Sequence, residues 1–128
     1  MSTISGHCLC GDVKFSTEAE HLWCGHCHCT MCQLGHGAAF VTWASYPDNA
    51  VILKDSKLVW YQSSKKGERG FCSQCGTTLF FRSTKWPGEL HIATSLIQGK
   101  TNPQPTGHAH YDTHFSWVTK LNDLPVDE

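Results

Sequence analysis

The chain has 128 residues, a mass of 14.3 kDa and a formal net charge of -1 from ten Lys and Arg against eleven Asp and Glu. This length suits one domain with a modest core, and we expect residues 1–128 to form it. The balanced charge gives no support for a general nucleic-acid binder, and no apolar run approaches the roughly 18 residues of a membrane span. Because the start lacks a signal-peptide pattern, we expect a soluble cytoplasmic protein with reduced thiols.

Short runs rich in β-branched and aromatic residues, separated by turn residues, predict strands and little helix. In chain order the predicted strands are Gly11–Phe15, Ala39–Trp43, Val51–Leu53, Leu58–Gln62, Thr77–Arg82 and Glu89–Thr94. The polar stretch SSKKGERG at residues 63–70 is predicted as a turn. Residues 98–108, with two prolines and two glycines, are predicted as a long irregular loop. The pattern predicts a mainly β, largely antiparallel domain.

The eight cysteines fall into three tight groups rather than being spread along the chain. Short adjacent pairs are poor disulfide partners for one another, and clustered cysteines in a reduced compartment are typical of metal binding or catalysis. The groups are Cys8 with Cys10, the run from Cys24 to Cys32, and Cys72 with Cys75. We therefore expect zinc ions, two per chain, to bind these groups.

The CLC and CSQC pairs together supply four thiolates for one zinc ion. On a straight strand, residues two apart have Cβ atoms about 6.6 Å apart, whereas neighbouring sulfurs around tetrahedral zinc lie about 3.8 Å apart. The chain must bend at each pair, and Gly11 and Gly76 supply the conformational freedom. We assign Cys8, Cys10, Cys72 and Cys75 to a closed structural zinc site.

The stretch WCGHCHCTMC contains a second candidate zinc site. Cys27, Cys29 and Cys32 form a CxCxxC pattern, which offers three sulfurs to one ion. Structural zinc sites are filled by four protein ligands, whereas catalytic sites leave one position to water or substrate. We therefore interpret these three cysteines as ligands of a catalytic zinc.

Three neighbouring residues bear on the fourth position of that second zinc. Cys24 has CxxC spacing to Cys27 and is a possible fourth ligand, but it is equally typical of a small buried apolar side chain. His26 and His28 alternate with the cysteines, so on an extended segment they face away from the metal. We expect supporting or surface positions for both imidazoles.

The segments GHCLCGDVKF, CHCTMCQLGHGAAF, LVWYQSSKKGERGFCSQCGTTLF and FSWVTKLNDLP resemble motifs of the glutathione-dependent formaldehyde-activating enzyme family, in that order. The resemblance implies a β-tent fold, similar to that of methionine sulfoxide reductase B. It also implies carbon–sulfur lyase chemistry, in which a small thiol such as glutathione binds as thiolate to the three-cysteine zinc. The thiol then adds to formaldehyde or a related small electrophile.

Candidate substrate-binding residues follow from charge and from glycine positions. Members of this family often carry Arg or Lys after the third catalytic cysteine, whereas here Gln33 and Leu34 follow Cys32. Seven zinc-bound thiolates outweigh the charge of two zinc ions, so an anionic thiol requires a local basic patch. We predict that Arg69, beside Lys65 and Lys66 in the polar turn, provides it. We also predict that Gly35 and Gly37 allow close approach of the backbone to a ligand.

Two other functional interpretations compete with the enzyme. A non-catalytic two-zinc binding module, as in the centromere protein V relatives, is favoured if Cys24 closes the second site. A redox protein cycling its CxxC pairs is disfavoured because no βαβ pattern surrounds them. His108, His110 and His114 suggest a third metal site only weakly, since an HxH pattern with irregular flanks is common.

Overall fold

The computed structural model describes residues 3–99 and 102–127, which contain eleven strands, one α-helix and four short 3-10 helices. The helices are α1 (Thr30–His36), η1 (Asp48–Ala50), η2 (Thr94–Leu96), η3 (Tyr111–Thr113) and η4 (Ser116–Asp123). The strands are β1 (Ile4–His7), β2 (Lys14–Thr17), β3 (Trp23–Cys27), β4 (Val41–Pro47), β5 (Val51–Lys54), β6 (Leu58–Gln62), β7 (Gly67–Cys72), β8 (Thr78–Ser83), β9 (Glu89–Ala93), β10 (Ile97–Gln98) and β11 (His108–Ala109). Within this described part of the chain, every helix is too short or too polar to cross a membrane.

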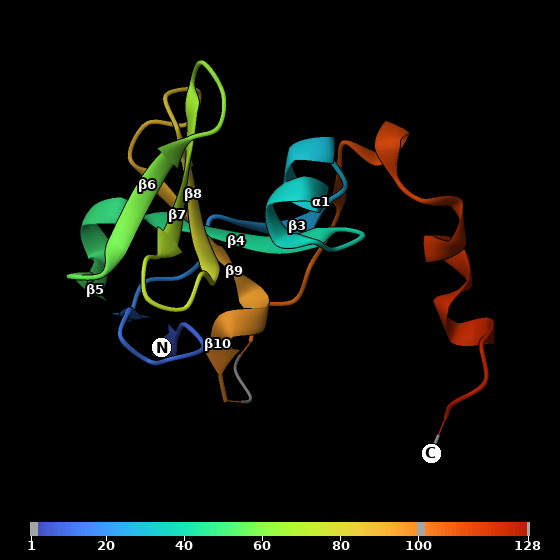
Figure 1. Ribbon diagram of the computed structural model, residues 1–128, viewed down its shortest axis with the longest axis horizontal. Helices are drawn as coiled ribbons and strands as arrows, with labels where there is room; N and C mark the ends of the chain where they lie inside the picture. Colours follow the sequence, from blue (N-terminus) through green and yellow to red (C-terminus); the bar gives the residue numbers. More distant parts are fainter. Residues whose placement is uncertain (1–2, 100–101, 128) are drawn as a thin grey trace.

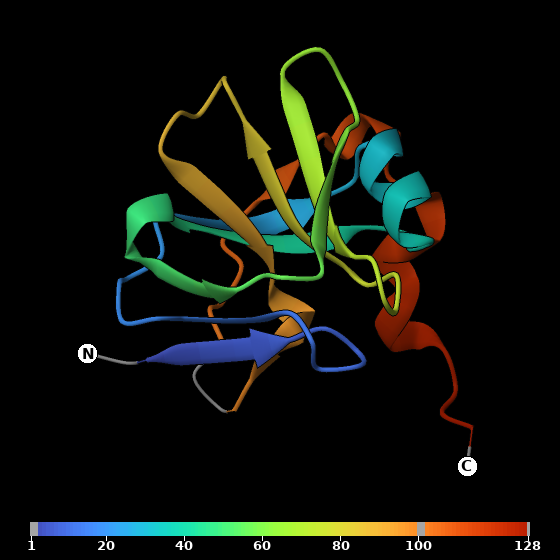
Figure 2. The same cartoon turned by 60° about the vertical axis from the view of Figure 1, so that its left-hand side comes forward.

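The strands form two sheets, and the predicted mainly β class with little helix is confirmed. The smaller sheet has the order β10-β1-β2-β5, and the larger has the order β11-β3-β4-β9-β8-β7-β6. Only the pairing of β11 with β3 is parallel among the described strands. Figure 2 shows the small sheet, with β1 in dark blue, below the strongly twisted strands of the large sheet.

The main core lies between the two sheets because both contribute buried apolar side chains to it. Phe15 of β2 packs edge-on against Phe80 of β8, with ring centroids 5.7 Å apart. Along β4, Ala44 and Tyr46 join this core, whereas Trp43 joins a second cluster on the opposite face. Alternate residues of a strand face opposite sides of the sheet. The large sheet is therefore buried on both faces at β4.

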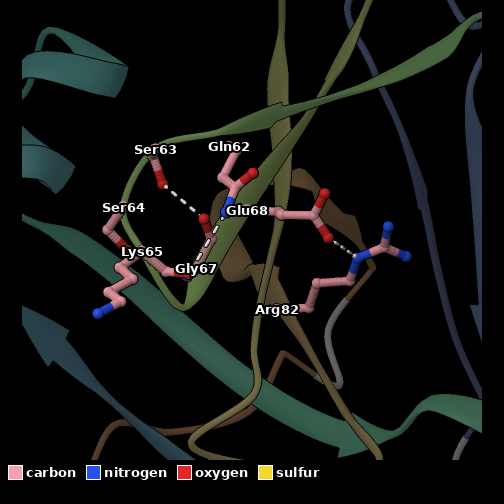
Figure 3. Close-up of polar contacts among 7 residues, drawn as sticks. All are labelled: Gln62, Ser63, Ser64, Lys65, Gly67, Glu68 and Arg82. Atoms are coloured by element: carbon pink, nitrogen blue, oxygen red, sulfur yellow. Dashed lines mark hydrogen bonds and ion pairs between the residues drawn. The ribbon is translucent and has the colours of Figure 1, made fainter.

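The turn predicted for residues 63–70 is wrong over its second half. Within this stretch, residues 63–66 form the loop of the hairpin between β6 and β7 (Figure 3), where the Gln62 side chain donates a hydrogen bond to the Lys65 carbonyl at 3.3 Å. Strand β7 starts at Gly67 and continues to Cys72. The strand was missed because glycines and charged residues have low β-propensity, although Arg69 and both glycines of β7 are buried here.

Other predicted elements were shifted or missed. The strands predicted near β5, β6, β8 and β9 lie within one residue of their observed bounds, whereas β2 begins three residues later than predicted. Strands β1 and β3 and helix α1 were not predicted. Residues 102–107 are irregular, as predicted, while the ends of that segment pair as β10 and β11.

Gly6 of β1 is tightly packed between Phe15 of β2 and the segment that leads into β10. A Cβ atom at this position would meet the Leu96 carbonyl oxygen and the Phe15 ring well inside van der Waals distance. Because both neighbours are held in the core, we expect Gly6→Ala to lower the free energy of unfolding by about 1–3 kcal/mol. Urea denaturation measures this change. Gly107→Ala is the matched control, since an added Cβ there meets nothing within 4 Å, and equal loss in both variants would contradict the prediction.

Candidate metal centres

Four cysteines from two distant parts of the sequence have sulfur atoms that converge on one point. Cys8 and Cys10 follow β1, Cys72 ends β7 and Cys75 lies in the turn before β8. All four sulfurs lie within 4.8 Å of one another, and the distances from the Cys10 Sγ to the Cys8 and Cys72 Sγ atoms are 3.6 and 3.8 Å. These separations match tetrahedral zinc, whose Zn–S bonds are about 2.3 Å long. The donor set therefore fits a structural zinc ion.

Local backbone geometry produces this convergence. Gly11 and Gly76, the glycines expected to allow the bends, have φ values of 85° and 83°, a region that favours glycine. The Cys75 Sγ also lies 3.2 Å from the Thr77 hydroxyl. Hydrogen bonds from the side chain and backbone of Thr77 lower the pKa of Cys75 to about 5, so this sulfur is disposed to bind a metal as thiolate.

Cys27, Cys29 and Cys32 form the second sulfur group at the junction of β3 and α1. Cys27 is the last residue of β3, Cys29 caps the helix and Cys32 lies in its first turn. The backbone is extended at Cys29, with φ -66° and ψ 153°, and then coils, which returns Cys32 toward Cys27. The three sulfurs lie within 4.8 Å of one another. Their softness and spacing fit a zinc ion held by three protein ligands.

The three thiols interact strongly with one another and with two nearby donors. Contacts with the Sγ atoms of Cys27 and Cys32 lower the pKa of Cys29, whereas contacts with Cys29 and Cys32 raise the pKa of Cys27. The Trp43 indole Nε1 and the Arg69 Nη1 donate hydrogen bonds to the Cys32 Sγ at 3.4 and 3.6 Å. Both donors favour a negatively charged sulfur at this position.

Cys24 lies apart from the three-sulfur group. It is 1% exposed and belongs to the core between the sheets, whereas Cys27 belongs to the cluster on the opposite face of β3. The Cys24 Sγ lies 3.8 Å from the carbonyl oxygen of Pro103. Burial raises the pKa of the Cys24 thiol. This environment is that of a small apolar core residue rather than a metal ligand.

The histidines form contacts of their own on the β3 and β11 side. The Nδ1 of His26 lies 2.8 Å from the Thr42 hydroxyl, and the Nε2 of the fully buried His28 lies 2.9 Å from the Nδ1 of His108. His114 instead hydrogen-bonds the Tyr111 carbonyl. Across residues 3–99 and 102–127, no histidine joins a cluster of three metal-ligating side chains. The structure therefore brings His108 to His28 and does not assemble a third centre with His110.

A cavity of about 580 Å³ opens onto the three-sulfur group. Much of its wall is apolar and aromatic, and five ionisable side chains from β7, β9 and the loops before them also line it. The apolar group includes Trp23, Met31, Trp43, Phe81 and Trp86; the five ionisable residues are Lys66, Arg69, Lys85, Glu89 and His91, and His110 also lines the cavity. Clefts of this size, mostly apolar with a few polar groups, are typical of small-molecule sites.

Arg69 lies at this cavity, not in an exposed turn beside the four-cysteine group. It is 7% exposed, and its guanidinium carbon lies 5.0 Å from the centroid of the Phe81 ring. Gly35 and Gly37 do not line the cavity. Gly37 ends α1 with a φ of 60°, and a Cβ added at Gly35 would lie 3.7 Å from the Arg69 Cδ. Of the three residues, only Arg69 is placed to touch a ligand in the cavity.

Ser45 and His91 are two of the polar residues in the cavity wall that were not identified from the sequence. Ser45 is fully buried on β4, and the His91 Nε2 lies 3.3 Å from the Glu89 Oε1. The alternation of VTWASYP places Trp43 and Ser45 on one face of the strand. The alternation can be seen in the sequence. Which face of the strand lines a cavity, however, depends on the order of the strands in the large sheet.

Comparison with known proteins agrees with this arrangement. The pattern of the glutathione-dependent formaldehyde-activating enzyme family matches residues 3–113, and the chain belongs to this family. An uncharacterised lyase of Schizosaccharomyces pombe is 29% identical over 131 residues, which cover 100% of this chain and 95% of the relative. A Halomonas elongata protein named for the same family is 28% identical over 115 residues, covering 84% and 73% of the two chains.

A solved structure supports the fold. The crystal structure of a Rhodobacter sphaeroides protein matches with a TM-score of 0.65 and 22% identity, covering 82% of this chain and 99% of that one.

The assignment of two separate centres predicts different responses to loss of one sulfur. We expect the wild-type protein to contain two zinc ions per chain and Cys29→Ser to contain one, with most of the fold intact. Cys75→Ser should lose the other ion and unfold much of the chain, because that centre joins β1 to β7. Metal analysis and circular dichroism measure both effects. Cys24→Ala is the control and should keep two ions; loss of one zinc from it would contradict the separation of Cys24 from the site.

Proposed function

We propose that the protein is a zinc-dependent carbon–sulfur lyase that joins a small thiol to formaldehyde or a related small electrophile. The sulfur attacks the carbonyl carbon to form a C–S bond, and the thiol proton ends on the oxygen, which gives a hydroxymethyl thioether with glutathione as the thiol. The observation that carries the proposal is the group of Cys27, Cys29 and Cys32, whose three sulfurs face a cavity of about 580 Å³.

A zinc ion held by these three sulfurs would lower the pKa of an incoming thiol and so supply a bound thiolate at neutral pH. The protein groups around it have separate roles. Arg69 and the Trp43 indole hold Cys32 in place through their hydrogen bonds to its sulfur. Trp43 and Phe81, with ring centroids 6.2 Å apart, form an apolar wall that limits water near the reacting carbonyl.

The charges around the cavity suit an anionic thiol. Lys66, Arg69 and Lys85 line it against the single carboxylate of Glu89. Their excess positive charge supplies the basic patch that an anionic thiol requires. Such a patch is required because metal-bound thiolates would make the protein more negative. Glutathione carries two carboxylates and one ammonium group at neutral pH, so this cavity supports a thiol of that kind without the Arg or Lys that often follows the third cysteine in the family.

The separation of Cys24 from the three sulfurs favours the enzyme over a non-catalytic two-zinc module. Such a module requires protein ligands at all four positions of both ions. The Cys24 sulfur faces the core on the other side of β3, so this nearest cysteine is not positioned to complete the second set.

The direct test is whether the zinc-loaded protein accelerates adduct formation. Exchange NMR on a mixture of glutathione and formaldehyde measures the rate at which the two interconvert with their adduct. We expect catalytic amounts of wild-type protein to increase the exchange rate, and Cys29→Ser to abolish the increase. Equal exchange rates with wild-type protein and with buffer would contradict the proposed reaction.

Among the cavity residues, Arg69 is the one whose replacement we expect to affect the turnover of the thiol most specifically. We expect Arg69→Met to lower kcat/KM for glutathione by about 10- to 100-fold, because a buried charged donor near the thiol is lost. Steady-state kinetics at equal zinc content measures this.

Arg82→Met is the matched control for this prediction. Arg82 is exposed on β8 and pairs with Glu68 at 2.9 Å, as Figure 3 shows. The control should keep near wild-type activity. A comparable loss in both variants would show that the effect of Arg69 is not local.

A further inference from the structure

Residues 108–113, which contain β11 and η3, hold His28 through its backbone and its ring. The His28 N–H donates a hydrogen bond to the Ala109 carbonyl at 2.9 Å. The Thr113 hydroxyl donates one to the His28 carbonyl at 2.7 Å, and the His28 Nε2 lies 2.9 Å from the His108 Nδ1. We call residues 108–113 the clamp segment. It contacts the N–H, the carbonyl and the imidazole of one residue, and that residue is fully buried.

His28 lies between two of the three grouped sulfurs, those of Cys27 and Cys29. Because the peptide unit is planar, the His28 carbonyl and the Cys29 nitrogen share one rigid plane. A hydrogen bond that fixes this carbonyl therefore also fixes the direction in which the chain continues to Cys29. The Cys29 Sγ in turn accepts a hydrogen bond from the Cys32 N–H at 3.3 Å. The contacts to His28 thus act on the relative positions of the three sulfurs.

Gln33 adds a second link between the clamp segment and the sulfur group. Its Nε2 lies 3.0, 3.1 and 3.3 Å from the main-chain carbonyl oxygens of His28, Thr113 and Ala39. A side-chain amide has only two N–H groups, so one of them is shared between two of these acceptors. Gln33 directly follows Cys32 in α1. Its amide therefore ties the helix that holds Cys32 to the same carbonyl that Thr113 holds.

The clamp segment turns sharply at His110, between β11 and η3. The φ of His110 is 53°, and within residues 3–99 and 102–127 it is the one non-glycine residue with a positive φ. A left-handed non-glycine residue is strained and persists where surrounding contacts hold it. The His110 carbonyl accepts hydrogen bonds from the Thr113 N–H at 3.3 Å and from its hydroxyl at 3.1 Å. This turn brings Thr113 back to the His28 carbonyl.

The two sulfur groups differ in how distant parts of the chain brace them. The four-sulfur group joins segments that are far apart in sequence, such as Cys10 and Cys72, whose Sγ atoms are 3.8 Å apart. The three-sulfur group comes entirely from residues 27–32, so it has no ligand from a distant segment. Metal ligands that lack such a brace depend on the groups that surround them for their orientation. The clamp segment, which lies about 80 residues later in the chain, provides this support.

We propose that residues 108–113 act as a clamp that holds the three-sulfur group in its metal-binding geometry, with Thr113 and Gln33 as positioning residues. Neither residue touches the substrate or the metal; both act through the His28 carbonyl. The clamp rests on the zinc ligands named in the proposed function, and it is independent of the reaction that the zinc supports.

Release of zinc from the fully loaded protein to the coloured chelator 4-(2-pyridylazo)resorcinol tests the clamp. We expect two phases, with the faster one from the three-sulfur group because it has fewer protein ligands. Thr113→Val keeps the shape of the side chain and removes the hydroxyl. It should accelerate the faster phase by about 10-fold or more and leave the slower phase unchanged. Thr113→Ser keeps the hydroxyl and should release zinc at the wild-type rate.

Thr106→Val is the matched control. The Thr106 hydroxyl donates a hydrogen bond to the Cys24 carbonyl at 3.3 Å, so the same substitution removes a bond to the same strand, β3, away from the three sulfurs. Its release kinetics should equal those of the wild type. Gln33→Met is a second test of the clamp, because it removes the amide from a partly exposed side chain. It should accelerate the faster phase as Thr113→Val does.

The visible spectrum of the cobalt-substituted protein measures the geometry of the sulfur ligands separately from stability. We expect the cobalt–thiolate bands of Thr113→Val and Gln33→Met to differ from those of the wild type, and the bands of Thr113→Ser and Thr106→Val to match them. Wild-type release rates and spectra in both Thr113→Val and Gln33→Met would overturn the clamp. Equal acceleration of both release phases, or a comparable effect of Thr106→Val, would overturn it as well.

The outcomes for the clamp and for the lyase can be separated. If both clamp variants release zinc faster but wild-type protein leaves the exchange of glutathione with formaldehyde unchanged, the lyase proposal fails and the clamp stands. If wild-type protein accelerates the exchange and neither variant releases zinc faster, the clamp fails and the lyase proposal stands.

Discussion

The two sulfur groups are connected through a single strand, β7, and the arrangement of the cavity depends on it. At its end, Cys72 joins the four-sulfur group together with Cys8 and Cys10. Three residues earlier, Arg69 points to the opposite face and reaches the Cys32 sulfur at 3.6 Å. A register shift between Gly70 and Phe71 lies between these two positions. A metal ion bound at Cys72 would therefore also fix the depth at which Arg69 enters the cavity.

The two faces of the large sheet border different environments. One face packs against the small sheet and contains Cys24, Ala44, Phe80 and Ile92 in an apolar core. The other face carries Trp23, Trp43, Phe81 and Arg69, and it borders the cavity. Figure 1 shows α1 lying along β3 and β4 at one end of this sheet, where the short helix brings Cys32 to Cys27. Strands and the short helix thus hold Cys27, Cys32 and Cys72, whereas Cys8, Cys10, Cys29 and Cys75 lie in the turns and connections beside them.

The cysteine framework could be predicted from the sequence because spacing alone carries it. CLC, CSQC and CxCxxC each bring sulfurs together over a few residues, and only the bends at Gly11 and Gly76 had to be inferred. Strand β7 and the place of Arg69 could not be predicted, since GERGFC has the composition of a turn and becomes a strand only between β6 and β8. The pairing of Ser45 with His91 depends on register across strands 46 residues apart in sequence, which local patterns do not contain.

The central claim is that the protein supplies three sulfurs to the second zinc and leaves the fourth position to a thiol. X-ray absorption at the zinc edge measures this directly on wild-type protein purified without added thiols. With one four-sulfur and one three-sulfur ion, we predict an average of about 3.5 sulfur ligands per zinc, rising to about 4 when glutathione is added. An average of about 4 before any thiol is added would show that the protein closes both ions itself and would contradict the claim.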